Sequence, residues 1–211
     1  MNDFLKFLSR PNFSGEFRKP SLADLFLPFA VYLLFAIPLG IILYIVSGLL
    51  DVSPKIIQLN TQERIVYGIL LTPLIEEIFF RLIYVFNKRN LFIIIFSSLS
   101  LIIVFIIKTE LYKAYLFLSI FFFFALLLLC FKSSSDFFEH HFKFFFYFIA
   151  IIFAVLHIFN FSGINSVKHI LVVFLVIPQF ILGVILGYLR ITYGFLYAVC
   201  FHTIVNLSLL F

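Results

Sequence analysis

Two adjacent carboxylates, Glu76 and Glu77, lie within an apolar segment of the chain, and Arg81 follows one helical turn later. The segment, residues 69–86, carries no other charged side chain. A charge at the centre of a lipid bilayer costs at least about 2.5–3.5 kcal/mol. These three groups therefore require partners, water or a function, and together they are candidates for a functional site.

Further polar side chains lie in apolar segments nearer the C-terminus. His157 ends one such segment, and His202 and Asn206 share a helical face in another because they are four residues apart. Gln179 is an additional candidate in the segment between them. No single helix can satisfy all of these groups in a membrane, so several helices must converge on one polar cavity.

Carboxylates, imidazoles, an amide and a guanidinium are the components of a hydrolytic site. A carboxylate and an imidazole can hold and deprotonate one water molecule. A second imidazole with an amide can donate hydrogen bonds to a developing oxyanion. Arg81 is four residues after Glu77, so it is better placed to pair with that carboxylate than to take part in the chemistry.

The same side chains include a ligand set for zinc, because two histidines and one carboxylate can bind this metal. Glu76, His157 and His202 are the residues that would hold it. The chain has no H-E-x-x-H motif, which excludes a metalloprotease of that type. Cys130 and Cys200 lie in apolar stretches without ligand spacing and are expected to act as small hydrophobic residues.

The composition is that of an integral, multi-pass membrane protein. Hydrophobic residues make up 64% of the 211-residue chain and charged residues 12%, with a mean hydropathy of +1.20. Soluble domains are about 45–50% apolar and about 25% charged. The net charge of +5 comes from residues lying mainly between apolar segments, a distribution that sets membrane orientation and does not indicate nucleic-acid binding.

The apolar segments predict an all-α bundle of about seven membrane spans around a polar intramembrane cavity. Residues 1–21 are expected to form a cytoplasmic N-terminal tail, and residues 22–211 a single transmembrane domain. With the N-terminus inside, Lys and Arg are in excess on the cytoplasmic side, and we expect a plasma-membrane location. The expected spans cover residues 22–49, 64–86, 91–107, 111–131, 144–159, 169–189 and 195–211.

Several local features are predicted within these segments. Ser21 and Asp24 form a capping-box pattern at the start of the first span. Residues 53–54, Ser-Pro, are expected to begin a short interfacial helix in the following connector. Gly183 and Gly187, four residues apart, predict a small-residue face for close contact between helices.

Three motifs in order resemble the CPBP family, the CAAX-processing and bacteriocin-processing intramembrane proteases that are also called Abi proteins. The resemblance covers roughly residues 63–210, and glutamine, glycine and tyrosine positions between the second and third motifs are similar to the family as well. The first predicted span lies outside it. The motifs are Glu76-Glu77-x-x-x-Arg81, Phe153-x-x-x-His157 and His202-x-x-x-Asn206.

The resemblance implies an all-α bundle with a conical cavity open toward the cytoplasm, and an endopeptidase that works by a metal-free, glutamate-driven mechanism. It implies that Glu76 and His157 activate water and that His202 and Asn206 stabilise the oxyanion. Glu77 with Arg81 would shape the site. The substrate would be a membrane-associated or lipid-modified protein or peptide, such as a prenylated CAAX protein, a peptide leader or a membrane-protein segment.

Other readings of the same residues are open at this point. The charged groups could be an ion-pair cluster that holds helices together, in a non-proteolytic interaction or bacteriocin-immunity protein built on the same scaffold. Deep carboxylates could also relay protons in a transporter. The chain shows no internal repeat, which disfavours the inverted-repeat transporter folds.

Overall fold

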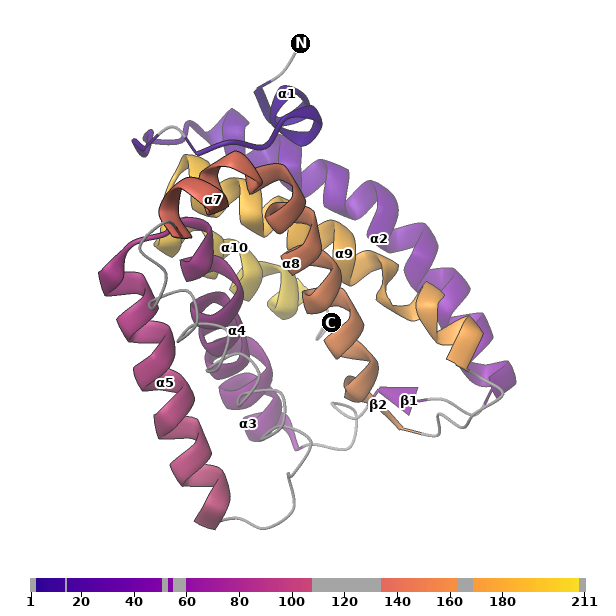
Figure 1. The fold of residues 1–211 in the computed structure, drawn as a ribbon. Coiled ribbons are helices and arrows are strands. Elements are labelled where there is room, and N and C mark those ends of the chain that lie inside the picture. The colour runs from indigo at the N-terminus through magenta and orange to yellow at the C-terminus, as the bar shows by residue number, and fades with distance from the viewer. Residues whose placement is uncertain are drawn as a thin grey trace.

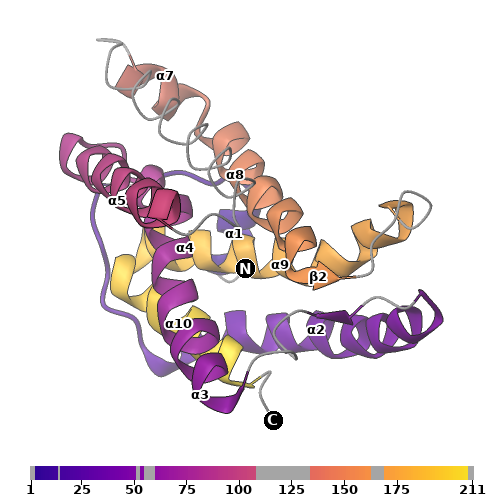
Figure 2. The ribbon, with the colours of Figure 1, turned by 90° about the horizontal axis from the view of Figure 1, so that it is seen from below.

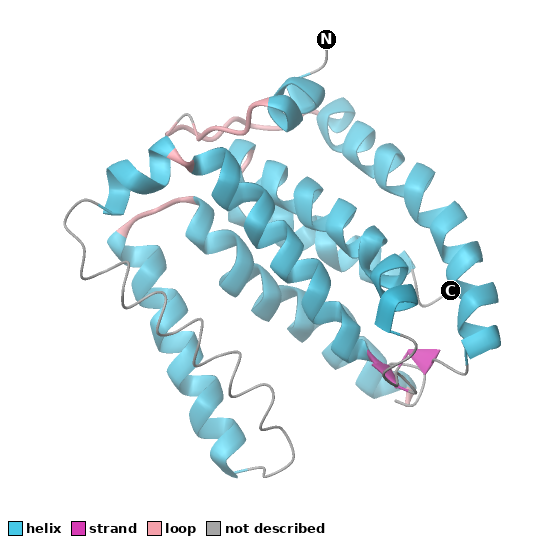
Figure 3. Cartoon of the chain, turned by 45° about the vertical axis from the view of Figure 1, so that its right-hand side comes forward, coloured by secondary structure: helices cyan, strands magenta, loops and turns pink. Residues whose placement is uncertain are grey.

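The computed structural model describes residues 3–13, 15–50, 53–54, 60–107, 134–162 and 169–208. The described chain is mostly helical, so the predicted all-α class is confirmed (Figures 1 and 3). The predicted span 111–131 lies outside the described residues. The elements are α1 (Asp3–Ser9), α2 (Leu22–Leu50), β1 (Ser53–Pro54), α3 (Thr61–Glu63), η2 (Arg64–Leu71), α4 (Thr72–Arg81), η3 (Leu82–Tyr84), α5 (Lys88–Ile107), α7 (Ser134–His140), α8 (Phe142–Leu156), η4 (His157–Asn160), β2 (Phe161–Ser162), α9 (His169–Thr192) and α10 (Phe195–Ser208).

Two helical stretches of the described chain are long and apolar enough to cross a membrane. They are Leu22–Ile42 in α2 and Phe142–Asn160, which combines α8 and η4. Two shorter apolar helices cover Val176–Thr192 and Phe195–Ser208. Only 11% of the α2 window is buried within the protein, so most of this apolar helix faces outward. An apolar surface of this kind supports association with a membrane.

Helix α9 lies at the centre of the bundle and packs against α8, α10 and α2 (Figure 1). The close contact with α8 depends on two glycines. A Cβ atom at Gly183 would lie 3.1 Å from the Phe153 ring, and one at Gly187 would lie 2.6 Å from the Phe146 ring. The predicted small-residue face at these glycines is therefore confirmed as a site of close helix packing.

The N-terminal segment packs against the ends of α8 and α9 (Figure 1). Phe4 of α1 is buried, and its ring lies 4.9 Å from the Tyr188 ring of α9, measured between centroids. The backbone N–H of Arg18 donates to the carbonyl of Thr192 at 2.9 Å. The segment expected as a cytoplasmic tail is thus joined to the helical domain by aromatic packing and a backbone hydrogen bond.

Two local predictions have opposite outcomes. The capping box at the start of α2 is confirmed, because the Ser21 N–H donates to Asp24 Oδ2 at 2.9 Å and the Asp24 N–H donates to Ser21 Oγ at 3.3 Å. The interfacial helix expected from Ser53-Pro54 is wrong. These residues form β1, which pairs with β2 in antiparallel register, Ser53 opposite Ser162 (Figure 3).

The predicted span over residues 64–86 is helical but not uniform. It consists of the π-helix η2, the α-helix α4 and the 3₁₀-helix η3, and it ends at Tyr84. The π-helix has a wider turn, in which each N–H donates to the carbonyl five residues earlier. Helix α4 lies beside α10 (Figure 2), which brings the acidic pair next to the C-terminal histidine motif.

Candidate active site

The polar side chains predicted for the site come from three parts of the fold that meet in the interior. Helix α4 carries the acidic pair and Arg81, the start of η4 carries His157, and α10 carries His202 and Asn206. Arg81 and His202 are almost completely buried. The structure therefore brings together residues that are 125 positions apart in the sequence, as the convergence argument requires.

Glu77 lies between a histidine and an arginine and has no exposed surface. Its Oε1 atom accepts a hydrogen bond from Nδ1 of His202 at 3.0 Å, and its Oε2 atom lies 3.4 Å from Nε of Arg81. A carboxylate accepts hydrogen bonds, so His202 carries a proton on Nδ1. The other ring nitrogen, Nε2, is thereby turned toward Glu76.

His157 is held in the same way by a different acceptor. Its Nδ1 atom lies 2.7 Å from the carbonyl oxygen of Phe153, one helical turn earlier. A carbonyl can only accept, so Nδ1 of His157 also carries a proton. Its Nε2 atom faces Glu76, as that of His202 does. Both imidazoles, when neutral, therefore present a lone pair to the same carboxylate.

Glu76 occupies the centre of this arrangement. Its Oε1 atom lies 3.8 Å from Nε2 of His157, and its Oε2 atom lies 3.6 Å from Nε2 of His202. These distances exceed those of a direct hydrogen bond and suit contacts bridged by water. Within the described part of the chain, Oε2 is buried without a hydrogen-bond partner. A carboxylate and two imidazole lone pairs are all acceptors, so they suit a bridging group that donates protons, such as water.

The ion pair expected between Arg81 and Glu77 is present, but the guanidinium rests mainly on aromatic rings. Its central carbon lies 4.3 Å from the centroid of the Phe153 ring and 5.9 Å from that of Phe80. None of its nitrogens makes a hydrogen bond with a described residue. A buried cation needs an opposite charge or a π-face to offset its desolvation, and this site supplies both.

Sequence reasoning gave Phe153 no role, although it lies four residues before His157 in the second motif. Its ring is fully buried and contacts three site residues. The ring centroids of His157 and His202 lie 4.5 and 6.0 Å from it, and the Arg81 guanidinium lies over its face. The spacing to His157 is the only signal in the sequence that places this ring in the site.

Arg190 is a second residue whose position was not foreseen. It is only 3% exposed, although arginine is mostly found at the protein surface. Its Nε atom donates to the backbone carbonyl of Arg81 at 3.1 Å. That carbonyl belongs to the last turn of α4, where helices leave acceptors without partners. Arg190 thus stabilises the end of the helix that carries the acidic pair.

Asn206 is engaged differently from the expectation that it donates to an oxyanion with His202. Its Nδ2 atom donates to the backbone carbonyl of Gly68 in η2 at 2.9 Å. Gln179, half-buried on α9, takes no part in the hydrogen bonds and ion pairs of the site. The predicted residues that contact one another are therefore the acidic pair, Arg81 and the two histidines.

Zinc is the metal that the sequence allows at Glu76, His157 and His202. Among residues 3–13, 15–50, 53–54, 60–107, 134–162 and 169–208, no three His, Cys, Asp or Glu side chains are arranged to hold a metal ion. The arrangement does fit a water molecule, which can donate one hydrogen to the carboxylate and the other to an imidazole.

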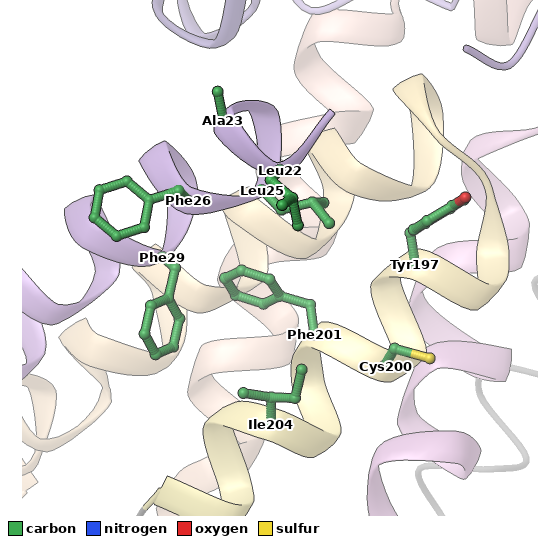
Figure 4. Close-up of a pocket in the computed structure, with 9 residues that line it drawn as sticks. All are labelled: Leu22, Ala23, Leu25, Phe26, Phe29, Tyr197, Cys200, Phe201 and Ile204. Atoms are coloured by element: carbon green, nitrogen blue, oxygen red, sulfur yellow. The ribbon is translucent and has the colours of Figure 1, made fainter. Parts of the chain in front are cut away.

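A groove of about 560 Å³ lies on the opposite face of α10, between this helix and the start of α2 (Figure 4). Among the described residues that line it, the only polar side-chain atoms are the hydroxyl of Tyr197 and the thiol of Cys200. These residues include no carboxylate or imidazole, so the candidate site lies on the other face of the helix. The lining residues are Leu22, Ala23, Leu25, Phe26, Phe29, Tyr197, Cys200, Phe201 and Ile204.

The chain was compared with protein-family models, with curated proteins and with solved structures, and none of them matches it. The order of the three motifs and the geometry around Glu76 remain the observations that bear on function. Together they place one carboxylate between two oriented imidazoles, beside a fully buried ion pair.

Proposed function

We propose that this protein is an intramembrane endopeptidase of the CPBP type, which hydrolyses a peptide bond in a membrane-associated or lipid-modified protein or peptide. One observation carries the proposal. The Glu76 carboxylate lies within 4 Å of the Nε2 atoms of His157 and His202, and both rings are fixed through Nδ1 by separate acceptors. A carboxylate base beside two imidazoles of fixed orientation meets the requirement for activating a water molecule.

The reaction would begin with a water molecule bound between Glu76 and His157. Glu76 takes one proton while the oxygen attacks the carbonyl carbon of the scissile bond, and His157 accepts a hydrogen bond from the remaining hydrogen. His202, which takes up a proton at Nε2 from the surrounding water before the attack and keeps it through the cycle, would donate from Nε2 to the resulting oxyanion. The intermediate collapses when Glu76 returns its proton to the amide nitrogen, so the C–N bond breaks and an acid and an amine leave.

The second carboxylate would act through His202. Glu77 accepts the Nδ1 hydrogen of His202, so it fixes the orientation of the ring and would stabilise the imidazolium in the transition state. Arg81 offsets the charge of Glu77 without reaching the reacting atoms. Two adjacent glutamates thereby take separate roles, one as the base and the other as a positioning residue.

We further propose that the chain lies in the plasma membrane, crosses it seven times and has its N-terminus in the cytoplasm. The two apolar helical stretches in α2 and α8–η4 support association with a membrane, as does the outward-facing apolar surface of α2. Large side chains such as Leu34 and Ile41 are 68% and 59% exposed there. In a bilayer these side chains would contact lipid instead of water.

Comparative proteomics of membranes tests the endopeptidase directly. Cells that express the wild-type chain are compared with cells that express Glu76→Gln, which keeps the side-chain shape and removes the base. The expected result is a membrane protein or peptide that stays uncleaved only with the variant. Glu139→Gln, at an exposed carboxylate of α7, is the matched control and should process the substrate normally. Identical cleavage products with Glu76→Gln and wild type would exclude the proposal.

A further inference from the structure

The π-helix η2 lies immediately before the helix that carries the acidic pair. At its end, the N–H of Thr72 donates to the carbonyl of Tyr67, five residues earlier. In this pattern the next carbonyl, that of Gly68, would accept from the N–H of residue 73. Residue 73 is Pro73, which has no N–H. The proline therefore leaves the Gly68 carbonyl without a donor from its own helix.

The missing hydrogen bond is supplied from another helix. Asn206 of α10 donates Nδ2 to the Gly68 carbonyl at 2.9 Å, across 138 positions of sequence. An unpaired backbone carbonyl in apolar surroundings is strongly unfavourable, and prolines in membrane helices are tolerated where a neighbouring helix satisfies the freed group. Asn206 and Pro73 are thus physically linked, although they do not share a motif.

This hydrogen bond has a direct geometric consequence for His202. Asn206 and His202 lie one turn apart on the same face of α10, which runs beside η2 and α4 (Figure 2). Asn206 makes a hydrogen bond to Gly68, and His202, one turn earlier, makes one to Glu77. These two hydrogen bonds fix the position of α10 along its axis and its rotation about that axis. The Nε2 atom of His202 can face Glu76 only if both are kept.

We propose that Asn206 is a positioning residue that holds His202 in place by satisfying the Gly68 carbonyl, which Pro73 leaves free. One of its two Nδ2 hydrogens makes this contact. The catalytic part of this inference rests on the proposed endopeptidase activity. The link between Asn206 and Pro73 does not, because it follows from the hydrogen bonds that Thr72 and Asn206 make to carbonyls of η2.

A double-mutant cycle tests the link through rescue. Asn206→Leu removes the donor at similar volume, and Pro73→Ala returns an N–H that can donate to Gly68. The full-length protein in detergent is measured for its unfolding temperature and for its rate of substrate cleavage. Asn206→Leu should lower both, the rate by roughly tenfold or more. Adding Pro73→Ala should recover a substantial part of each loss.

A matched control uses a proline that has no connection to Asn206. Pro38 lies inside α2 and is exposed, so Pro38→Ala should not rescue Asn206→Leu. The inference is overturned if Pro73→Ala gives no more rescue than Pro38→Ala. It is also overturned if the unfolding temperature recovers while the cleavage rate does not, because Asn206 would then act on the transition state itself.

A third readout separates failure of this inference from failure of the proposed function. With ¹⁵N-labelled histidine, the signal of the His202 Nδ1 atom reports its hydrogen bond to Glu77 without any substrate. Asn206→Leu should shift this signal, and the double variant should move it back toward the wild-type position. This result would support the positioning role even if no peptide were cleaved. An unchanged signal in Asn206→Leu would overturn the positioning role even in an active protease.

Discussion

The two faces of helix α10 differ in the polarity of their side chains and in what those side chains contact. The inner face carries His202, which makes a hydrogen bond to Glu77 of α4, and Asn206, which donates to the Gly68 carbonyl of η2. The outer face lines an apolar groove with Cys200, Phe201 and Ile204. A helix of a soluble domain usually places its polar residues outward. Here the polarity is directed inward, which is the arrangement expected when the surroundings are lipid and the reactants are polar.

The contrast also shows that a few side chains are sufficient to form the candidate site. The groove is large, yet its described lining residues include no carboxylate or imidazole. The inner face lies beside a carboxylate, two oriented imidazoles and an ion pair that are within a few ångströms of one another. We therefore expect substitutions on the inner face to change activity by large factors, and substitutions on the outer face to have small effects.

The largest effect is expected at His157. His157→Gln keeps a polar side chain but removes the ring nitrogen that faces Glu76. Losing one member of a general-base pair should reduce cleavage by roughly 10²–10⁴-fold. The rate is measured with purified protein in proteoliposomes and a peptide identified by the proteomic comparison. Ile204→Ala on the outer face is the control, and an equal loss in the two variants would remove the distinction between the faces.

The next effect concerns stability. Arg81→Met removes the guanidinium and leaves the buried Glu77 carboxylate without its cation, which should cost about 3–5 kcal/mol. Unfolding in a detergent series with increasing denaturant measures the loss. The double variant Glu77→Gln with Arg81→Met removes both charges and should recover part of it. If Arg81→Met were as stable as wild type, the ion pair would not be holding the inner face together.

A smaller effect on stability is expected at two glycines, one in the buried core and one on the outward surface. A methyl group at Gly187 would lie 2.6 Å from Phe146 and 3.1 Å from Tyr84, so Gly187→Ala should destabilise the protein by about 1–3 kcal/mol. Gly40 on α2 has nothing within 4 Å of the same position. Gly40→Ala should be neutral or stabilising by up to about 1 kcal/mol. Thermal unfolding of the two variants side by side checks the difference.

The smallest effect is expected in the groove. Cys200 is exposed and makes no contact with the site, so Cys200→Ala should change the cleavage rate by less than about twofold. The thiol should also react with a membrane-permeant maleimide in the folded protein. A large loss of activity after either change would show that the outer face contributes to catalysis.

Several features of this protein follow from its residue pattern alone. Buried charges in apolar segments require convergence, and the structure brings Glu76, His157 and His202 together as that argument demands. The capping box at Ser21 and the packing glycines of α9 are also readable, because each depends on a few neighbouring residues or on one helical face. The all-α class follows from a high apolar content arranged in segments long enough for membrane-spanning helices.

Other features were decided only when the helices packed. The proton positions on His157 and His202 depend on which acceptor lies within 3 Å of Nδ1, and for His202 that acceptor is 125 residues away. The burial of Arg190 depends on the end of a distant helix, and the hydrogen bond of Asn206 depends on a carbonyl freed by a proline. A residue pattern specifies which groups must find partners. The choice of partner depends on how the helices are shifted and rotated relative to one another, and local sequence does not specify this.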